Sequence, residues 1–193
     1  MPIKRLTQLF ILLCFIGLLM LWQVFTGYSD SSTVKKEKYL LKFNLNELTE
    51  SEVRIIQQAG LPIVIMHRSK EDLKKLLAIR SHLLDPDSKN SRQPKYAKNY
   101  YRSLKPEFFI AYAVSPRTGR DIHYRLESFK TAYSDNNTDQ WFGGFSAVNS
   151  NSLYDKAGRA YQQSDSSNLD IPNYKINASN ILYVYTLKEL DFD

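Results

Sequence analysis

Cysteine is almost absent from this chain of 193 residues. The single cysteine, Cys14, lies inside an apolar run near the N-terminus. One cysteine excludes a disulfide bond within the chain, and it excludes a metal cluster held by several thiolates in the rest of the sequence. We therefore expect neither a disulfide framework nor a cysteine-bound cofactor.

Histidine is also scarce, with His67, His82 and His123 as its three instances. They lie far apart and do not follow the spacing of metal-binding motifs. Imidazole is a common ligand of zinc, copper and iron, so its dispersal argues against a site for these metals. We predict that all three are surface or strand-edge residues.

Nucleic-acid-binding motifs are missing as well. The net charge is +6, but the basic residues are dispersed, and Glu37 interrupts the densest group, Lys35, Lys36 and Lys38. Residues 88–105 mix tyrosines with basic residues, which can favour single-stranded nucleic acid, but no RNA- or DNA-binding motif accompanies them. We interpret this segment as a long loop over the core, with its tyrosine hydroxyl groups in water.

One long apolar run is present, at residues 9–25, and Gln23 is its only polar residue. Extended back to Leu6, it approaches the ~20 residues that cross a bilayer as a helix. Trp22 suits a membrane interface, and the basic pair Lys4-Arg5 precedes the run. The pattern predicts a membrane anchor whose N-terminus stays in the cytoplasm.

A cleaved signal peptide is the alternative for this segment. The run is long for a signal, and residues 26–29 lack a good small-x-small cleavage site, which favours an uncleaved anchor. We therefore expect an anchor at residues 1–26, a polar linker at 27–38 and a head domain at 39–193.

The head shows many short apolar segments separated by turn signals, which predicts an antiparallel, mainly β fold. Two of these segments flank Ala59-Gly60 and predict a β-hairpin. Strands are expected at residues 39–45, 52–57, 62–67, 108–114, 122–126, 141–146, 159–161, 174–176 and 181–186.

One helix is expected in the head, at residues 70–80. Ser69 is placed to cap it, and Asp72 stands at the capping-box position. Leu73, Leu76 and Leu77 are predicted to form its buried stripe.

Several stretches of the head make a combination that is hard to produce by chance. They are GLPIVI at 60–65, LDPDS at 84–88, QPKYAKN at 93–99, YRSLKPE at 101–107, WFGGF at 141–145, YDKAGR at 154–159 and NLDIP at 168–172. With them, the chain resembles the Rieske iron–sulfur subunit of the cytochrome bc1 complex (ubiquinol–cytochrome c reductase) in its proteobacterial form. The resemblance implies a single transmembrane helix and a β-sandwich head with a small inserted subdomain, which residues 108–161 match.

Members of that family hold a two-iron two-sulfur cluster between two loops, each of which gives one cysteine and one histidine to iron. The resemblance places other residues at the ligand positions: Ser115, Arg117, Ala147 and Ser150. Arg120 and Asn149 stand where the family has two further cysteines, which form a disulfide. The family pattern is retained at Gly119, Ser152 and Tyr154, the last two of which hydrogen-bond the cluster sulfurs in the family. Residues 164–167, Ser-Asp-Ser-Ser, replace the proline-rich loop that covers the cluster.

These replacements predict a degenerate paralogue that binds no cluster, metal or other cofactor and is not itself an enzyme. Serine, alanine and arginine offer neither thiolate nor neutral nitrogen ligands, and Arg117 places a permanent positive charge where a cation would bind. Other serines, including Ser146, lie near the loops, but neither loop contains a histidine to act as a base.

We therefore expect a non-redox, Rieske-like subunit or assembly partner of a respiratory complex. It would lie in the bacterial inner membrane with its head in the periplasm, and its partners would be cytochrome b, a true Rieske subunit or a terminal oxidase. One alternative is a binding module that uses Arg117 and Arg120 to hold a carboxylate or phosphate group. An active Rieske subunit is the least favoured alternative, and no nucleic-acid partner is expected.

Overall fold

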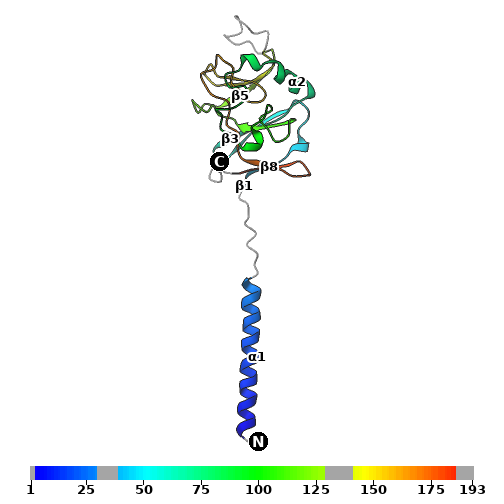
Figure 1. Cartoon of the computed structure of the whole chain (residues 1–193), viewed down its shortest axis with the longest axis vertical. Coiled ribbons are helices and arrows are strands. Elements are labelled where there is room, and N and C mark those ends of the chain that lie inside the picture. The colour runs from blue at the N-terminus through cyan, green and yellow to red at the C-terminus, as the bar shows by residue number, and fades with distance from the viewer. Residues whose placement is uncertain (1–2, 30–38, 129–140, 186–193) are drawn as a thin grey trace. The chain divides into compact units, whose positions relative to one another are not determined.

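The computed structural model describes residues 3–29, 39–128 and 141–185 (Figure 1). The chain divides into two compact units, Met1–Glu37 and Lys38–Asp193. Most of the expected linker and the polar segment 129–140 lie outside the described residues. The two units are described separately below.

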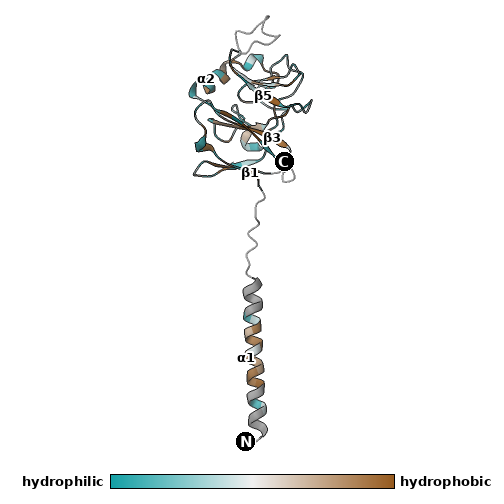
Figure 2. Cartoon of the chain, turned by 180° about the vertical axis from the view of Figure 1, so that it is seen from behind, coloured by the Kyte–Doolittle hydropathy of each residue, from teal (hydrophilic) through white to brown (hydrophobic). Residues whose placement is uncertain are grey.

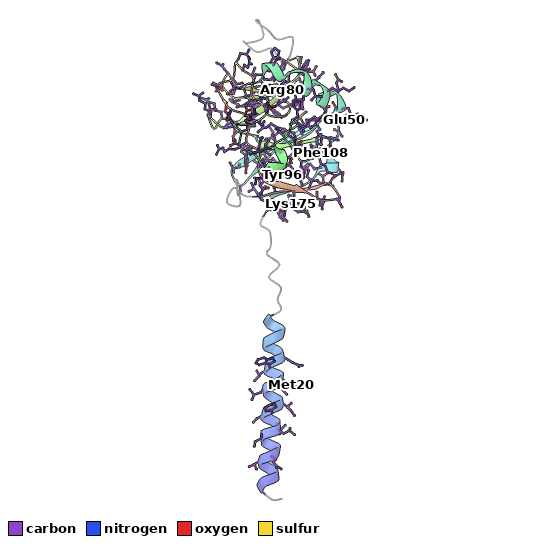
Figure 3. All side chains as sticks on the ribbon, viewed as in Figure 1. Met20, Glu50, Arg80, Tyr96, Phe108 and Lys175 are labelled. Carbon is purple, nitrogen blue, oxygen red and sulfur yellow. The ribbon has the colours of Figure 1, made fainter. Side chains whose placement is uncertain are left out.

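The first unit contains one helix, α1 (Ile3–Ser29). Its central part is apolar, as the brown ribbon in Figure 2 shows. Large side chains are exposed along it, among them Leu18, Trp22 and Met20, the last of which is labelled in Figure 3. Within the part of the chain that the structure describes, no helix combines the length and the apolarity that crossing a membrane requires.

Within its described residues, the second unit, the head, contains three antiparallel sheets of three strands each. The first sheet has the order β1 (Tyr39–Asn44), β9 (Ile181–Tyr185) and β8 (Tyr174–Ile176). The second has the order β2 (Val53–Gln58), β3 (Leu61–His67) and β4 (Phe108–Tyr112). The third has the order β5 (Ile122–Arg125), β6 (Gly144–Ala147) and β7 (Leu153–Tyr154). The expected mainly β, antiparallel class is confirmed.

One apolar core connects the three sheets. Ile63, Phe109, Phe145 and Leu182 come from different strands, have no exposed surface and belong to the same buried cluster. All five residues of β4 are buried, as its continuous apolar run predicts. Within the head, β5 and β1 lie at opposite ends, with β3 between them (Figure 1).

The hairpin expected around Ala59-Gly60 is confirmed, because β2 pairs antiparallel with β3 from Val53↔Met66 to Gln58↔Leu61. Both turn residues have positive φ, 49° for Ala59 and 81° for Gly60. Two left-handed residues match the right-handed twist of the strands that they join.

The expected helix is α2 (Lys70–Ala78), followed by the short η2 (Arg80–His82). Both bonds of its capping box are present: the Asp72 amide donates to Ser69 Oγ (3.0 Å), and the Ser69 amide donates to Asp72 Oδ2 (2.9 Å). The predicted stripe was partly wrong, since Leu77 is 56% exposed whereas Leu76 is 2% exposed. The inward face instead contains Asp72, Leu76 and Ile79, because the buried Lys156 supplies a charged partner for Asp72 at 2.5 Å.

The prediction of a strand at residues 159–161 was also wrong. This segment makes only isolated bridges, Tyr154↔Ala160 and Leu83↔Tyr161. The Asp155 carboxylate accepts hydrogen bonds from the amides of Ala157 and Arg159 and so directs the chain into a turn. The sheet instead gains β7, which the sequence pattern did not predict.

The segment 88–105 covers the core, as expected, and contains the short η3 (Lys95–Ala97). Two of its three tyrosine hydroxyl groups are bound within the protein, however, and are not left to water. Tyr96 Oη accepts from the Tyr174 amide (2.7 Å), and Tyr100 Oη donates to the Leu76 carbonyl. Arg102 of the same segment has no exposed surface.

Candidate functional site

The first of the loops identified from the sequence, residues 115–120, joins β4 to β5 through a tight turn. The Ser115 amide donates to the Arg120 carbonyl (2.8 Å), and the Gly119 amide donates to the Ser115 carbonyl (2.9 Å). This geometry buries Ser115, which is 1% exposed, and leaves Arg117 and Arg120 at the surface. The loop therefore presents one hydroxyl inward and two guanidinium groups outward.

The second loop, residues 148–152, joins β6 to β7. Ala147 is buried at the end of β6, where it pairs with Ile122, and its amide donates to the Ser152 carbonyl (3.0 Å). Asn149, at the exposed tip, has a φ of 48°. The Val148 amide donates to the Asp121 carbonyl at 3.0 Å, so the second loop is tied to the residue that follows the first.

A third loop, residues 164–167, is held against β7 by one serine. Ser164 Oγ accepts from the Leu153 amide (2.9 Å) and donates to the Leu153 carbonyl (2.7 Å). The Ser164 hydroxyl thus takes the place of a neighbouring strand residue, which would bond both the amide and the carbonyl of Leu153. As a result, Asp165 and Ser166 lie against both of the other loops.

Six side chains from these loops and β7 form two adjacent hydrogen-bonded groups, which meet at the neighbouring residues Asp165 and Ser166. One group is Ser150, Ser152 and Asp165, and the other is Ser115, Tyr154 and Ser166; together we call them the three-loop cluster. The Asp165 carboxylate accepts from Ser150 Oγ at 3.1 Å and also from Ser152 Oγ. Ser115 Oγ lies 3.1 Å from Ser166 Oγ and accepts from Tyr154 Oη at 3.2 Å.

The charge of Asp165 is stabilised within this cluster. The hydroxyl of Ser152, followed by that of Ser150 and the charge of Arg117, holds the pKa of Asp165 below its usual value, although partial burial opposes them. An aspartate with a lowered pKa is a weak base at neutral pH. No histidine among the described residues is hydrogen-bonded to the cluster, so the serines lack the base that a hydrolytic nucleophile needs.

The structure thus brings together four of the residues singled out from the sequence, namely Ser115, Ser150, Ser152 and Tyr154. Arg117 contacts the cluster only from outside, where its Nη1 donates to the backbone carbonyl of Asp165 (2.9 Å). Arg120 and Asn149 take no part in it, and Gly119 and Ala147 contribute backbone only. The acceptor at its centre, Asp165, was not assigned a role from the sequence, where it is one acid within a run of serines.

The donor set at the four ligand positions does not fit a Rieske cluster, which needs two thiolates and two imidazoles. Those positions hold two hydroxyls, one methyl and one guanidinium group. Within the described ranges, no group of three His, Cys, Asp or Glu side chains is placed to hold a metal ion.

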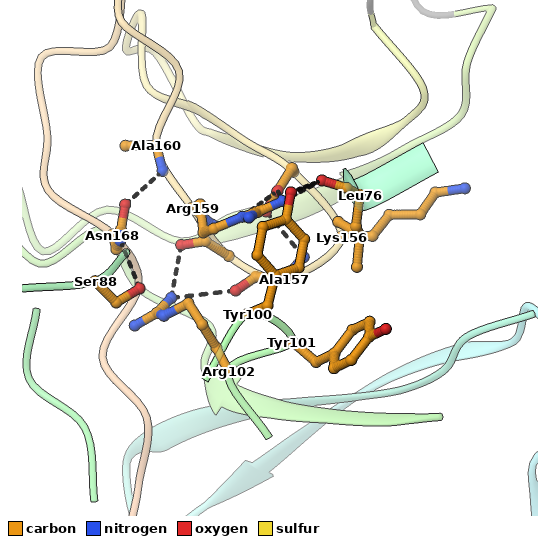
Figure 4. Close-up of polar contacts among 12 residues, drawn as sticks. Leu76, Ser88, Tyr100, Tyr101, Arg102, Lys156, Ala157, Arg159, Ala160 and Asn168 are labelled. Carbon is orange, nitrogen blue, oxygen red and sulfur yellow. Dashed lines mark hydrogen bonds and ion pairs between the residues drawn. The ribbon is translucent and has the colours of Figure 1, made fainter. Parts of the chain in front are cut away.

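A second, buried polar centre contains Arg102, Arg159 and Asn168 (Figure 4). The Arg102 guanidinium donates to the carbonyls of Ala157 (3.1 Å), Gly158 (2.9 Å) and Leu169 (2.6 Å). Arg159 forms an ion pair with Asp155 at 2.7 Å. Burial lowers the pKa of Arg102 to about 10, so that it stays charged at neutral pH.

Asn168 extends this centre to the chain around residue 85. Its side chain accepts from the Ala160 amide (2.7 Å) and donates to the Asp85 carbonyl (2.9 Å) and Ser88 Oγ (3.2 Å) (Figure 4). The stretches at 84–88, 101–107, 154–159 and 168–172 therefore meet in one place. Much of what carries the resemblance is a platform that supports the second and third loops.

The fold and the loops define a class of protein: an antiparallel β head in which two strand-connecting loops and a covering loop converge on one site. No family model matches the chain. The sequence is, however, 31% identical over 141 residues to the ubiquinol–cytochrome c reductase iron–sulfur subunit of Allochromatium vinosum. The match covers 72% of this chain and 66% of that relative, just under two thirds. It supports a Rieske-like relationship for this chain.

Proposed function

We propose that the chain is a non-redox, Rieske-like subunit or assembly partner of a respiratory complex of the cytochrome bc1 or bc1–oxidase type. In this proposal it holds no iron–sulfur cluster and transfers no electrons itself. The relative from Allochromatium vinosum is a subunit of ubiquinol–cytochrome c reductase by name, which supports this type of complex.

The three-loop cluster is the observation that carries the proposal. Asp165 reaches the hydroxyls of Ser150 and Ser152, and Ser166 contacts Ser115, at the positions that the resemblance assigns to the cluster site. The three loops thus bind one another through their own side chains. A head that retains its platform while its loops bind one another suits a structural role better than electron transfer.

We further propose that α1 attaches the chain to the bacterial inner membrane. The apolar run at 9–25 and the exposed side chains of Ile11, Phe15 and Leu19 support this attachment, because apolar surface of this kind is unfavourable in water.

The absence of a cluster is tested by iron and acid-labile sulfide analysis of the full chain purified in detergent, together with the electron paramagnetic resonance spectrum after reduction. We expect neither iron nor sulfide in stoichiometric amount and no Rieske signal. An authentic Rieske subunit prepared in parallel is the positive control. A Rieske signal from this chain would refute the proposal and restore the redox alternative.

The partner is tested by affinity purification of the tagged chain from detergent-solubilised native membranes. We expect cytochrome b, a true Rieske subunit or a terminal oxidase in stoichiometric amount. Recovery of the chain as a free monomer under conditions that keep the bc1 complex intact would argue against a subunit role.

A further inference from the structure

A cleft of about 400 Å³ lies beside the three-loop cluster. Its walls come from three separate stretches of chain: residues 84–92, the first loop and the segment 164–170. The polar residues that line it include Asn90, Arg92, Arg117, Asp165, Ser167 and Asp170. A volume of this size lies within the range of sites for small molecules.

The acceptor groups of this cleft are already engaged within the protein. The Asp165 carboxylate accepts from two serines of the second loop. The Asp170 carboxylate is paired with Arg92 Nη2 at 3.1 Å. Burial raises the pKa of Asp170, while the charges of Arg92 and Arg102 oppose the rise. The ion pair with Arg92 partly offsets the charge of this acid.

The donor groups, in contrast, are mostly available. Arg117 uses Nη1 for the Asp165 carbonyl, and Arg92 uses Nη2 for Asp170. Each guanidinium carries five N–H donors, so most of them remain without a partner among the described residues. The Arg92 side chain is 70% exposed, and Arg117 is exposed as well.

We propose that this cleft binds a small organic anion, whose carboxylate or phosphate group is held between Arg92 and Arg117. The planar fork of arginine matches both groups with two parallel hydrogen bonds. Asn90 and Ser167 line the same cleft and add neutral polar groups. Arg92 approaches from the stretch before the first loop, so the site uses a residue outside the loops that the sequence singled out.

The sequence suggested an anion site that uses Arg117 and Arg120 together. In the structure, Arg92 lines the cleft with Arg117 instead. Arg120 is exposed in the same loop but does not line the cleft. It therefore serves as a matched control for Arg117, with the same side chain and similar exposure. The anion site goes beyond the proposed respiratory role, and it stands or falls independently of any partner.

The experiment is isothermal titration calorimetry on the full chain in detergent, with inorganic phosphate and succinate as probes and chloride at equal ionic strength as the blank. We expect binding of at least one probe beyond the chloride blank. Arg117→Gln and Arg92→Gln should each weaken it by at least about tenfold, the loss expected for one charge-assisted contact. Arg120→Gln should leave it within about twofold of the unchanged chain.

Each probe identifies one ligand chemistry, because phosphate binding alone assigns a phosphate group and succinate binding alone a carboxylate. Arg117→Gln changes an exposed side chain, so it tests the site even if Arg92→Gln disturbs the pair with Asp170. Equal weakening by Arg120→Gln and Arg117→Gln would overturn the proposal in favour of general charge attraction. A response to neither probe beyond chloride would overturn it outright.

Discussion

At the scale of single residues, the buried Arg102 explains how the turn at 157–158 and the segment at 169 keep their positions. Arg102 satisfies three backbone carbonyl groups and the Gln93 side chain from a fully buried position. Carbonyls in a turn that lies inside the protein cannot reach water, and no strand pairs with them. One guanidinium group with five donors provides the hydrogen bonds that the amides of a helix or strand would otherwise donate to these carbonyls.

Replacement of Arg102 by alanine should lower the free energy of unfolding by about 3–5 kcal/mol, because it leaves the carbonyls of Ala157 and Leu169 buried without donors and removes one of the two hydrogen bonds to the Gly158 carbonyl. Urea denaturation of the full chain, followed by tryptophan fluorescence, measures the change. The matched control is Arg80→Ala, which removes an exposed ion pair with Asp87 (51% and 40% exposed side chains) and should cost less than about 1 kcal/mol. Similar losses for the two variants would contradict this role of Arg102.

Asp165 gives the three-loop cluster a dependence on pH. Its pKa in the folded protein is lowered from 3.8, chiefly by the Ser152 hydroxyl. A depressed pKa means that the carboxylate contributes stability above its ordinary pKa and that this contribution is lost as the pH falls through the lowered value. Acid should therefore loosen the contact between the second and third loops.

Asp165→Asn should lower the free energy of unfolding at neutral pH by about 0.5–1 kcal/mol, since the charged acceptor of two hydroxyl groups becomes neutral and solvent screens this exposed residue. The variant should also lose less stability than the unchanged chain when the pH is taken from about 5 to about 2. Urea unfolding across this pH series measures both effects. Ser167→Ala is the control in the same loop, and an identical pH dependence in Asp165→Asn and the unchanged chain would show that Asp165 is not the titrating group.

At the scale of elements, local sequence patterns correctly predicted those helices, strands and turns that depend on residues close together in the sequence. The β2–β3 hairpin, the capping box of α2 and the buried β4 all follow from residues within a few positions of one another. One error arose from a distant partner. Leu77 was predicted to be buried, yet Lys156 draws the opposite side of α2 inward through Asp72.

The candidate site, too, was predicted from the sequence only in part. The resemblance identified the first and second loops, and the structure brings Ser115, Ser150, Ser152 and Tyr154 together. The central role of Asp165 and the place of Arg92 in the cleft could not be predicted, because both depend on segments that the fold, and not the sequence order, brings side by side.

Gly144 sets the position of β6 against β7. It has a φ of 156°, and a Cβ at this position would collide with the carbonyl oxygen of Tyr154 across the strand pair. Gly144→Ala should therefore lower the free energy of unfolding by about 2–4 kcal/mol, because a paired backbone has no room to move aside. Thermal and urea unfolding of the variant measure this loss.

Gly60→Ala is the matched control, since Gly60 also has a positive φ, 81°, but a Cβ there meets nothing within 4 Å. It should cost only about 1 kcal/mol, the ordinary penalty of a left-handed alanine. Equal losses at the two positions would show that backbone conformation alone, and not the contact with β7, explains the effect at Gly144.

At the scale of the whole molecule, the two units have different bases for their stability. The head has a core with strands from all three sheets, whereas α1 exposes apolar side chains such as Leu12, Leu18 and Trp22. The head therefore has what it needs to fold alone. The exposed apolar side chains of α1 are in keeping with the membrane attachment proposed above.

A variant that lacks residues 1–37 should fold with the same thermal midpoint as the head of the full chain, because the unit Lys38–Asp193 keeps its entire core. It should also move from the membrane pellet to the supernatant after alkaline carbonate extraction of expressing cells, while the full chain stays in the pellet. Circular dichroism and immunoblotting measure the two outcomes. A full chain that carbonate releases would refute the attachment through α1, and a truncated head that fails to fold would show that the first unit contributes to the stability of the second.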